Sequence, residues 1–173
     1  YGDWSSDVCS SDLDKGIVPS EVATIAGEKA IARAGINKDN IGCLISASVC
    51  RDFIEPSTAS IIHRNLKIPS EAFVFDVSNA CLGVLNGMMI IANMIDQNQI
   101  LAGLVVAGEN GGPLLNNTIQ TLLSRPDITR SNIKSSFASL TIGSAAVGVV
   151  LSHKKISRQG HRLMGGVSLA ETQ

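Results

Sequence analysis

The chain has 173 residues, of which 45% are hydrophobic and 17% are charged, and its formal net charge is −1. This length corresponds to one domain with a sizeable core, and so low a charge argues against disorder. The near-neutral balance argues against a nucleic-acid-binding protein, which normally carries a basic surface. Polar residues or glycines interrupt the apolar stretches after roughly ten residues, too few to span a bilayer.

Alternating helices and strands are predicted along the chain. The predicted helices have apolar residues at helical spacing and span residues 19–35, 57–66 and 81–96. The predicted strands are short apolar runs between turn residues and span residues 41–49, 73–77, 101–107, 145–151 and 163–169. This order predicts a layered α/β fold with a mainly parallel sheet. The helix over residues 81–96 is apolar on nearly all sides, so we expect it to be buried.

Residues 1–13, YGDWSSDVCSSDL, lack the periodicity of either a helix or a strand. From Asp3 onward they can be back-translated into a common sequencing-adapter oligonucleotide read in frame. We interpret residues 1–13 as an artefactual segment, with a disordered polar tail as the alternative, and give them no role in fold or function. A reading frame that opens in this way predicts that the true N-terminus is missing.

The cysteines form no CxxC pair and no cluster with histidine at metal-ligand spacing, so we expect no structural zinc. They are Cys9, Cys43, Cys50 and Cys81. An apolar chain of this size needs no disulfides, and no charged segment followed by an apolar run marks a secretory signal. These features predict a reducing, cytoplasmic setting.

Cys81 lies where the strand over residues 73–77 passes into the most hydrophobic predicted helix. The N–H groups and partial positive charge of a helix N-terminus favour a thiolate, and so lower a thiol pKa that is about 8.5 in free cysteine. The same N–H groups can stabilise an oxyanion when the sulfur attacks an acyl carbonyl. The position therefore suits a nucleophile, and a buried inert cysteine is the alternative.

Other candidate residues have simpler explanations. The three histidines, at positions 63, 153 and 161, are interpreted as surface residues, and Cys43 and Cys50 as small apolar residues of a strand. Residues 109–112 are glycine-rich but match no nucleotide-binding motif. Lys154, Lys155 and the nearby arginines could touch a coenzyme A phosphate or an acidic carrier protein, although a solvated basic loop explains them equally simply.

Six short motifs occur in order: AGI at 34–36, DNIGCLI at 39–45, EPSTA at 55–59, FDVSNACLG at 75–83, LVVAGE at 104–109 and IGSAAVGVVL at 142–151. Together they resemble the β-ketoacyl-acyl-carrier-protein synthase III group of the thiolase superfamily, over about residues 22–171. The resemblance implies a thiolase-like α-β-α fold, with residues 14–173 as its N-terminal half, and Cys81 as the nucleophile that takes an acyl chain from a thioester. It also implies a homodimer without a cofactor.

Four stretches are more similar to OleA-type enzymes: residues 48–59, 78–83, 92–95 and 139–144. Those enzymes join two long-chain acyl-CoA molecules head to head into a β-keto acid. In that group a glutamate just before a proline acts as a base in the partner subunit's site, and Glu55 holds this position, 26 residues before Cys81. A condensation without decarboxylation needs a base for the α-proton, and burial raises a carboxyl pKa toward that task. The alternative is an acidic residue that only precedes a helix N-terminus.

The resemblance favours an acyltransferase that forms carbon–carbon bonds by Claisen condensation, acting on acyl-CoA without binding nucleic acid. The nearest alternative is a decarboxylating synthase III that uses acyl carrier protein, and further alternatives are a non-catalytic thiolase-fold scaffold and a cysteine-dependent hydrolase. The family completes its site with a histidine and an asparagine, or a second histidine, from the second half of the subunit, and no residue here matches them.

We therefore expect the isolated 173-residue chain to be inactive, with apolar surface left exposed. Its incubation with acyl-CoA, followed by assay of free coenzyme A, should show no turnover above a protein-free control. Steady turnover by the purified chain would contradict this expectation.

Overall fold

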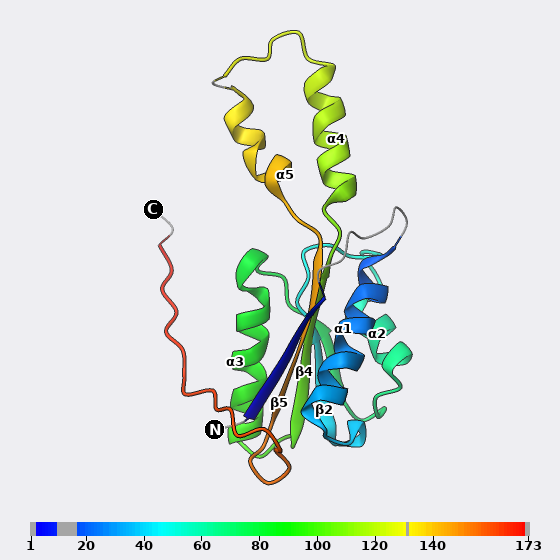
Figure 1. Cartoon of the computed structure of the whole chain (residues 1–173), viewed down its shortest axis with the longest axis vertical. Helices are drawn as coiled ribbons and strands as arrows, with labels where there is room; N and C mark the ends of the chain where they lie inside the picture. The colour runs from blue at the N-terminus through cyan, green and yellow to red at the C-terminus, as the bar shows by residue number, and fades with distance from the viewer. Residues whose placement is uncertain (1–2, 10–16, 131, 172–173) are drawn as a thin grey trace.

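In the computed structural model of the chain, the backbone is described for residues 3–9, 17–130 and 132–171, and side chains for residues 17–130 and 133–171. One sheet forms the middle layer, with helices on both of its faces (Figure 1). The predicted α-β-α layering is therefore confirmed. No helix in the described ranges is long and apolar enough to cross a membrane.

The sheet has the strand order β1-β5-β4-β2-β3. Its strands are β1 (Asp3–Cys9), β2 (Ile41–Ser46), β3 (Phe73–Asp76), β4 (Ala102–Glu109) and β5 (Ala145–Ser152). Strand β2 pairs in parallel with β3 and β4, whereas β5 pairs antiparallel with β4 and β1. Among the described strands β5 alone runs against the others, so the sheet is mainly parallel, as expected.

Helices α1 (Pro19–Ala34) and α2 (Thr58–Leu66) cover one face of the sheet, and α3 (Gly83–Asp96) covers the other (Figure 1). Helix α1 ends as predicted, because Gly35 takes the left-handed conformation with φ 66° and closes the helix with its N–H. Ser57 caps α2, with its Oγ accepting a hydrogen bond from the Ser60 N–H at 3.3 Å. Short 3-10 turns lie at Lys38–Asn40 and Ala80–Leu82.

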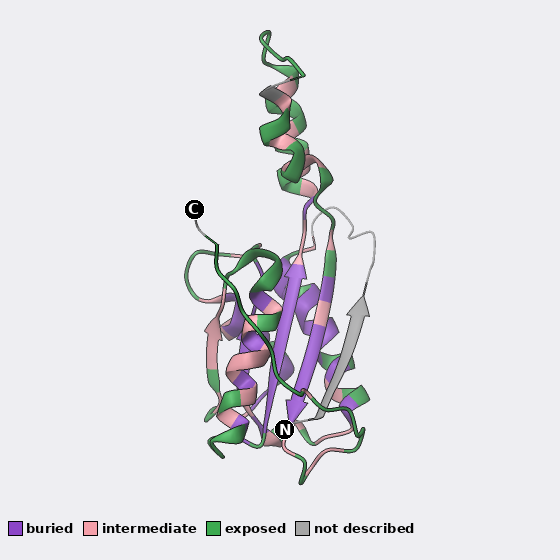
Figure 2. Ribbon diagram, turned by 90° about the vertical axis from the view of Figure 1, so that its left-hand side faces the viewer, coloured by how far each residue is buried: buried purple, intermediate pink, exposed green. Residues whose placement is uncertain are grey.

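Apolar side chains of the central strands point alternately to the two faces, because successive strand residues face opposite ways. In β4, Leu104 and Val106 belong to the core under α1 and α2, while Val105 belongs to the core under α3. All three are fully buried. Burial on both faces explains why these strands are continuous apolar runs rather than alternating ones, and Figure 2 shows the buried band through the sheet.

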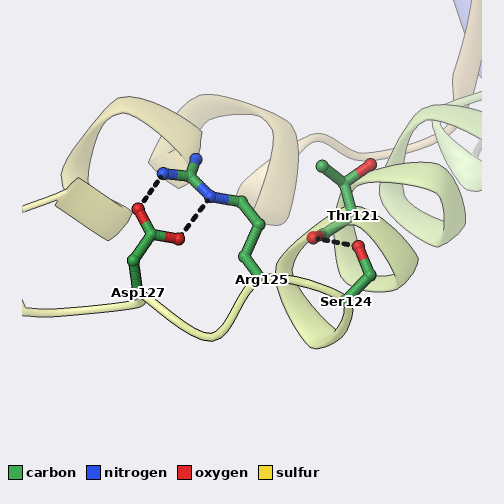
Figure 3. A network of polar contacts seen from close by, with 4 residues as sticks. All are labelled: Thr121, Ser124, Arg125 and Asp127. Carbon is green, nitrogen blue, oxygen red and sulfur yellow. Dashed lines mark hydrogen bonds and ion pairs between the residues drawn. The ribbon is translucent and has the colours of Figure 1, made fainter.

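A helical arm projects beyond the sheet between β4 and β5 (Figures 1 and 2). It contains α4 (Gly112–Leu123), a 3-10 turn at Asn132–Ser136 and α5 (Phe137–Thr141), and neither α-helix has a buried residue. After α4, Arg125 donates to both carboxylate oxygens of Asp127, at 3.1 and 2.8 Å (Figure 3). These hydrogen bonds hold the pKa of the Asp127 carboxyl below its usual range.

The secondary structure differs from the sequence prediction in two parts of the chain. The strand predicted at residues 163–169 is wrong, because these residues have no regular secondary structure. They lie against α3, which offers no free backbone edge for pairing, and they include Gly165 with φ 143°. In contrast, residues 3–9, to which no element is assigned from the sequence, pair as β1 with β5.

Edge pairing uses backbone N–H and C=O groups, so an extended segment needs no apolar pattern to join an open edge. This explains how β1 forms from residues without strand periodicity. Residues 1–2 and 10–13 lie outside the described residues, and the adapter origin of residues 1–13 stays a prediction.

Helix α3 is buried on one side only, although its composition predicts burial on all sides. Its buried residues follow a spacing of four and face the sheet: Gly83, Gly87, Ile91 and Ile95. On the other side, Leu82, in the turn before the helix, is 53% exposed and Leu85 is 56% exposed. Residues 163–169 cover this side of the most hydrophobic helix only in part, so the described chain leaves apolar surface exposed there.

Gly148 of β5 sets the distance between the sheet and α1. A Cβ at this position would lie 2.5 Å from the backbone oxygen and 2.8 Å from the carbonyl carbon of Ala26. Gly148→Ala should therefore push α1 away and lower the free energy of unfolding by about 1–3 kcal/mol, measured by urea denaturation. Gly143→Ala is the matched control, since nothing lies within 4 Å of a Cβ there. Equal stability of the two variants would contradict the packing argument.

Candidate active site

Cys81 lies in a sharp turn between β3 and α3. The turn includes Ala80, whose φ of 41° is unfavourable for a residue with a side chain. The Leu82 N–H donates to the Asn79 carbonyl at 2.9 Å, and the Asn79 side-chain amide donates to Asn86 Oδ1 at 2.6 Å. These bonds tie the segment before Cys81 to the first turns of α3. The predicted strand–turn–helix elbow is thus present, with a 3-10 turn before the α-helix.

The Cys81 side chain is exposed. In the described structure its backbone N–H donates to no backbone carbonyl, whereas the Leu82 and Gly83 N–H groups bond within the turn. An N–H without a partner beside an exposed sulfur is the arrangement an oxyanion on an attacked carbonyl requires. The turn can therefore present a nucleophile and one hydrogen-bond donor together.

Gly83 lets α3 begin directly against the sheet. A Cβ at Gly83 would lie 2.7 Å from the carbonyl oxygen of Ala47, which follows β2. Any larger residue would move the first turn of α3, and Cys81 with it. Gly83, two positions after the cysteine, therefore fixes the distance between the Cys81 thiol and the sheet.

Glu55 lies in the connection between β2 and α2, and its side chain is exposed. Cys81 lies in the connection between β3 and α3. Because β2 and β3 are adjacent and parallel, both connections leave the same edge of the sheet. In the part of the chain that the structure describes, no hydrogen bond or ion pair links the two side chains.

Three carboxylates hold the connection that carries Glu55. Glu109, at the end of β4, accepts hydrogen bonds from the backbone N–H groups of Val49 at 2.6 Å and Cys50 at 3.0 Å. Asp52 accepts from the Ser20 N–H at 2.9 Å and from its hydroxyl, at the start of α1.

Asp76, the last residue of β3, is the third of these carboxylates. It accepts from the N–H groups of Thr58 at 3.0 Å and Ala59 at 2.8 Å, in the first turn of α2. Sequence reasoning missed all three anchors, because each bridges residues between 17 and 60 positions apart. The sequence feature that could have indicated these anchors is an acidic residue at or near the end of an apolar strand.

Cys43 and Cys50 are poor nucleophiles. Burial raises the pKa of the Cys43 thiol to about 11, and burial together with a hydrogen bond to Glu109 raises that of Cys50 to about 11. Cys50 also donates through Sγ to the Asn110 carbonyl at 3.6 Å. Both thiols are therefore protonated at neutral pH, in agreement with their prediction as inert residues.

An apolar groove of about 390 Å³ lies along the partly covered side of α3. Leu82, the neighbour of Cys81, is part of its wall. The other walls come from α3 and the segment before the C-terminus, through Leu85, Met88, Met89, Leu163, Val167 and Leu169. The groove places apolar surface next to the exposed thiol.

The basic loop after β5 lies at the opposite edge of the sheet from Cys81. Ser152, which ends β5, pairs with Ala102 at the start of β4, whereas Cys81 follows the carboxyl end of β3. Lys154 and Lys155 in this loop are exposed. Of the histidines, His63 bonds through Nε2 to the Pro69 carbonyl at 3.0 Å. None of these residues joins the elbow.

No protein-family profile matches the chain. Curated relatives include the acyl-CoA:acyl-CoA alkyltransferases of Xanthomonas campestris, 38% identical over 160 residues, and Shewanella oneidensis, 40% identical over 162 residues. Both matches cover 92% of this chain, but 47% and 46% of the relatives. A β-ketoacyl-[acyl-carrier-protein] synthase III of Koribacter versatilis is 32% identical over 106 residues, 61% of this chain and 32% of that protein.

Solved structures of OleA from Xanthomonas campestris share the fold. The acetamide-bound structure gives a TM-score of 0.78 at 38% identity and covers 83% of this chain and 44% of that one. A cysteine-to-serine variant with bound lauric acid and lauroyl-CoA gives 0.76 at 38% identity, with 83% and 42% covered.

The fold and the sequence relatives together define a thiolase-like protein. Within that class the chain is a homologue of the OleA and β-ketoacyl-acyl-carrier-protein synthase III enzymes, and the predicted resemblance is confirmed. The chain spans about half the length of the curated OleA-type relatives it matches.

Alkylation by iodoacetamide tests whether the elbow presents a reactive thiol. At pH 8 a thiol of pKa about 11 is about one part in a thousand thiolate, so Cys81 should react about tenfold or more faster than Cys43 and Cys50. Mass spectrometry of the labelled peptides, in a Cys9→Ser background, measures the three rates. Cys81→Ser is the control and should abolish the fast phase. Equal rates at Cys43 and Cys81 would contradict the assignment.

Proposed function

We propose that the chain is the nucleophile-bearing part of an OleA-type acyltransferase, which joins two acyl-CoA molecules by a Claisen condensation. The observation that carries the proposal is the exposed Cys81 at the β3–α3 elbow, in a chain 38–40% identical to acyl-CoA:acyl-CoA alkyltransferases over 92% of its length. Cys81 is the proposed nucleophile and Glu55 the proposed base.

The positions of the two residues support their assignment. Variants of the Xanthomonas campestris OleA have been crystallised with a cysteine replaced by serine and with a glutamate replaced by alanine. Those two residues are 26 positions apart in that enzyme, the same separation as Glu55 and Cys81 here. A histidine replaced in a further variant lies farther beyond its cysteine than Gln173 lies beyond Cys81. We propose that a corresponding histidine lies outside this chain.

In the proposed first step, the Cys81 thiolate attacks the carbonyl carbon of an acyl-CoA. The Cys81 N–H stabilises the oxyanion, the carbon–sulfur bond to coenzyme A breaks, and coenzyme A leaves as a thiol after taking up a proton. The acyl chain is then a thioester on Cys81. The apolar groove that begins at Leu82 supplies surface for such a chain.

In the second step, Glu55 removes an α-proton from a second acyl-CoA. The resulting carbanion attacks the acyl carbonyl on Cys81, a carbon–carbon bond forms, and the Cys81 thiolate is released. Water then hydrolyses the β-ketoacyl thioester to a β-keto acid and coenzyme A. Glu55 is exposed in this chain, so we propose that it acts in the site of a second copy, where a partner surface would desolvate its carboxylate.

The decarboxylating synthase III reaction is the second candidate function. It is less well supported, because the synthase III of Koribacter versatilis matches 61% of this chain and the OleA-type relatives match 92%. We further propose a reducing, cytoplasmic location, since catalysis through Cys81 requires a free thiol.

Glu55→Ala separates the two steps. In the full-length enzyme, we expect release of β-keto acid to fall by about a hundredfold or more, because the variant lacks the base for the α-proton. Acylation of Cys81, followed as one equivalent of coenzyme A released in a single turnover, should change by less than about threefold. The matched control is Glu71→Ala, which removes an exposed glutamate before β3, at the opposite edge of the sheet. Normal condensation by Glu55→Ala would overturn the assignment of the base.

A further inference from the structure

The Asp76 carboxylate links the two connections that carry the proposed catalytic residues. It is half-buried at the end of β3 and accepts one hydrogen bond from Thr58 N–H and one from Ala59 N–H. Helix α2 already has a local cap in Ser57, so these bonds are additional to ordinary capping. Hydrogen bonds from backbone N–H to a carboxylate are stronger than neutral ones.

Few residues separate Asp76 and its hydrogen-bond donors from the two proposed catalytic residues. Glu55 is three residues before Thr58, and Cys81 is five residues after Asp76. A shift of the Asp76 carboxylate would therefore move the first turn of α2, and with it Glu55, which lies only three residues before Thr58. On the Cys81 side, the Asn79 side chain bonds to Asn86 and Gly83 packs close to the Ala47 carbonyl, so the elbow has contacts that do not involve Asp76.

Downstream of Glu55, Ser57 bonds to Ser60 within the first turn of α2, and the two hydrogen bonds to Asp76 tie that turn to the end of β3. Asp52 anchors the loop before Glu55, while the intervening Phe53 and Ile54 are 60% and 87% exposed. The stretch between the Asp52 anchor and the Asp76 anchor is thus largely exposed. Its direction depends on the two carboxylates at its ends.

We propose that Asp76 is a positioning residue, which orients the Glu55 base through the first turn of α2. This inference rests on the proposed function, in which Glu55 acts on a second copy of the chain. Asp76 of one subunit then affects condensation in the partner's site more than it affects acylation of Cys81 in its own subunit. Asp76→Asn is a sharp probe, because the new amide NH₂ faces a backbone N–H donor where a carboxylate oxygen accepted.

The experiment uses heterodimers of the full-length enzyme with one working site. One subunit carries Cys81→Ser and supplies Glu55, and the other carries Glu55→Ala and supplies Cys81. Asp76→Asn is then placed in either subunit, so that the two heterodimers have the same composition and the same cost in stability. The readouts are single-turnover acylation of Cys81 and formation of β-keto acid from acyl-CoA.

With Asp76→Asn in the subunit that supplies Glu55, we expect condensation to fall by about tenfold or more, while acylation stays within about twofold. In the subunit that supplies Cys81, the same substitution should lower condensation by less than about threefold. Equal losses in both placements, or no loss in either, would overturn the positioning role. The proposed function fails separately, if the parent heterodimer has no activity or the Glu55→Ala homodimer condenses normally.

Discussion

The close approach of α3 to the sheet is the constraint on which the site depends. Gly83 meets the Ala47 carbonyl so closely that no side chain fits between them, and Gly87 and Gly103 allow similar contacts farther along the helix. Because these contacts keep the helix from sliding along the sheet or moving away from it, they fix the position of the turn before it. Cys81 stands in that turn with its side chain exposed. The packing of α3 against the sheet therefore also sets the position of Cys81, the proposed nucleophile.

Carboxylates perform a second task, which is to fix loops that have no core of their own. Asp52, Asp76 and Glu109 each accept two hydrogen bonds at the edge of the sheet where Cys81 lies. The loop that bears Glu55 is thereby held while its tip stays exposed. A loop held in this way suits the proposed role of Glu55 as a base in a second subunit, and the exposed apolar Phe53 and Ile54 beside it suit contact with a protein surface.

Local patterns were sufficient to predict the elements whose ends are marked in the sequence. Pro19 and Gly35 delimit α1, and Ser57 caps α2, because each acts through its own backbone geometry. Long-range features were not predictable in this way. Residues 163–169 have a strand-like composition but no edge to pair with, and α3 is apolar on a side that the described chain covers only in part. The hydrogen bonds from α2 to Asp76 likewise depend on how β3 and α2 lie in the tertiary structure. The elbow made Cys81 a candidate, whereas its proposed role as nucleophile, like that of Glu55 as base, came from family resemblance.

In the proposed reaction, Cys81 carries an acyl chain, which is then joined to a second one. The most direct test of this reaction is incubation of the full-length enzyme with a long-chain acyl-CoA alone, followed by mass spectrometry of the Cys81 peptide and of the lipid products. We expect an acyl adduct on Cys81 and a β-keto acid formed without any malonyl donor, both absent in Cys81→Ser. Free fatty acid as the sole product, or a requirement for a malonyl thioester, would contradict the proposed reaction.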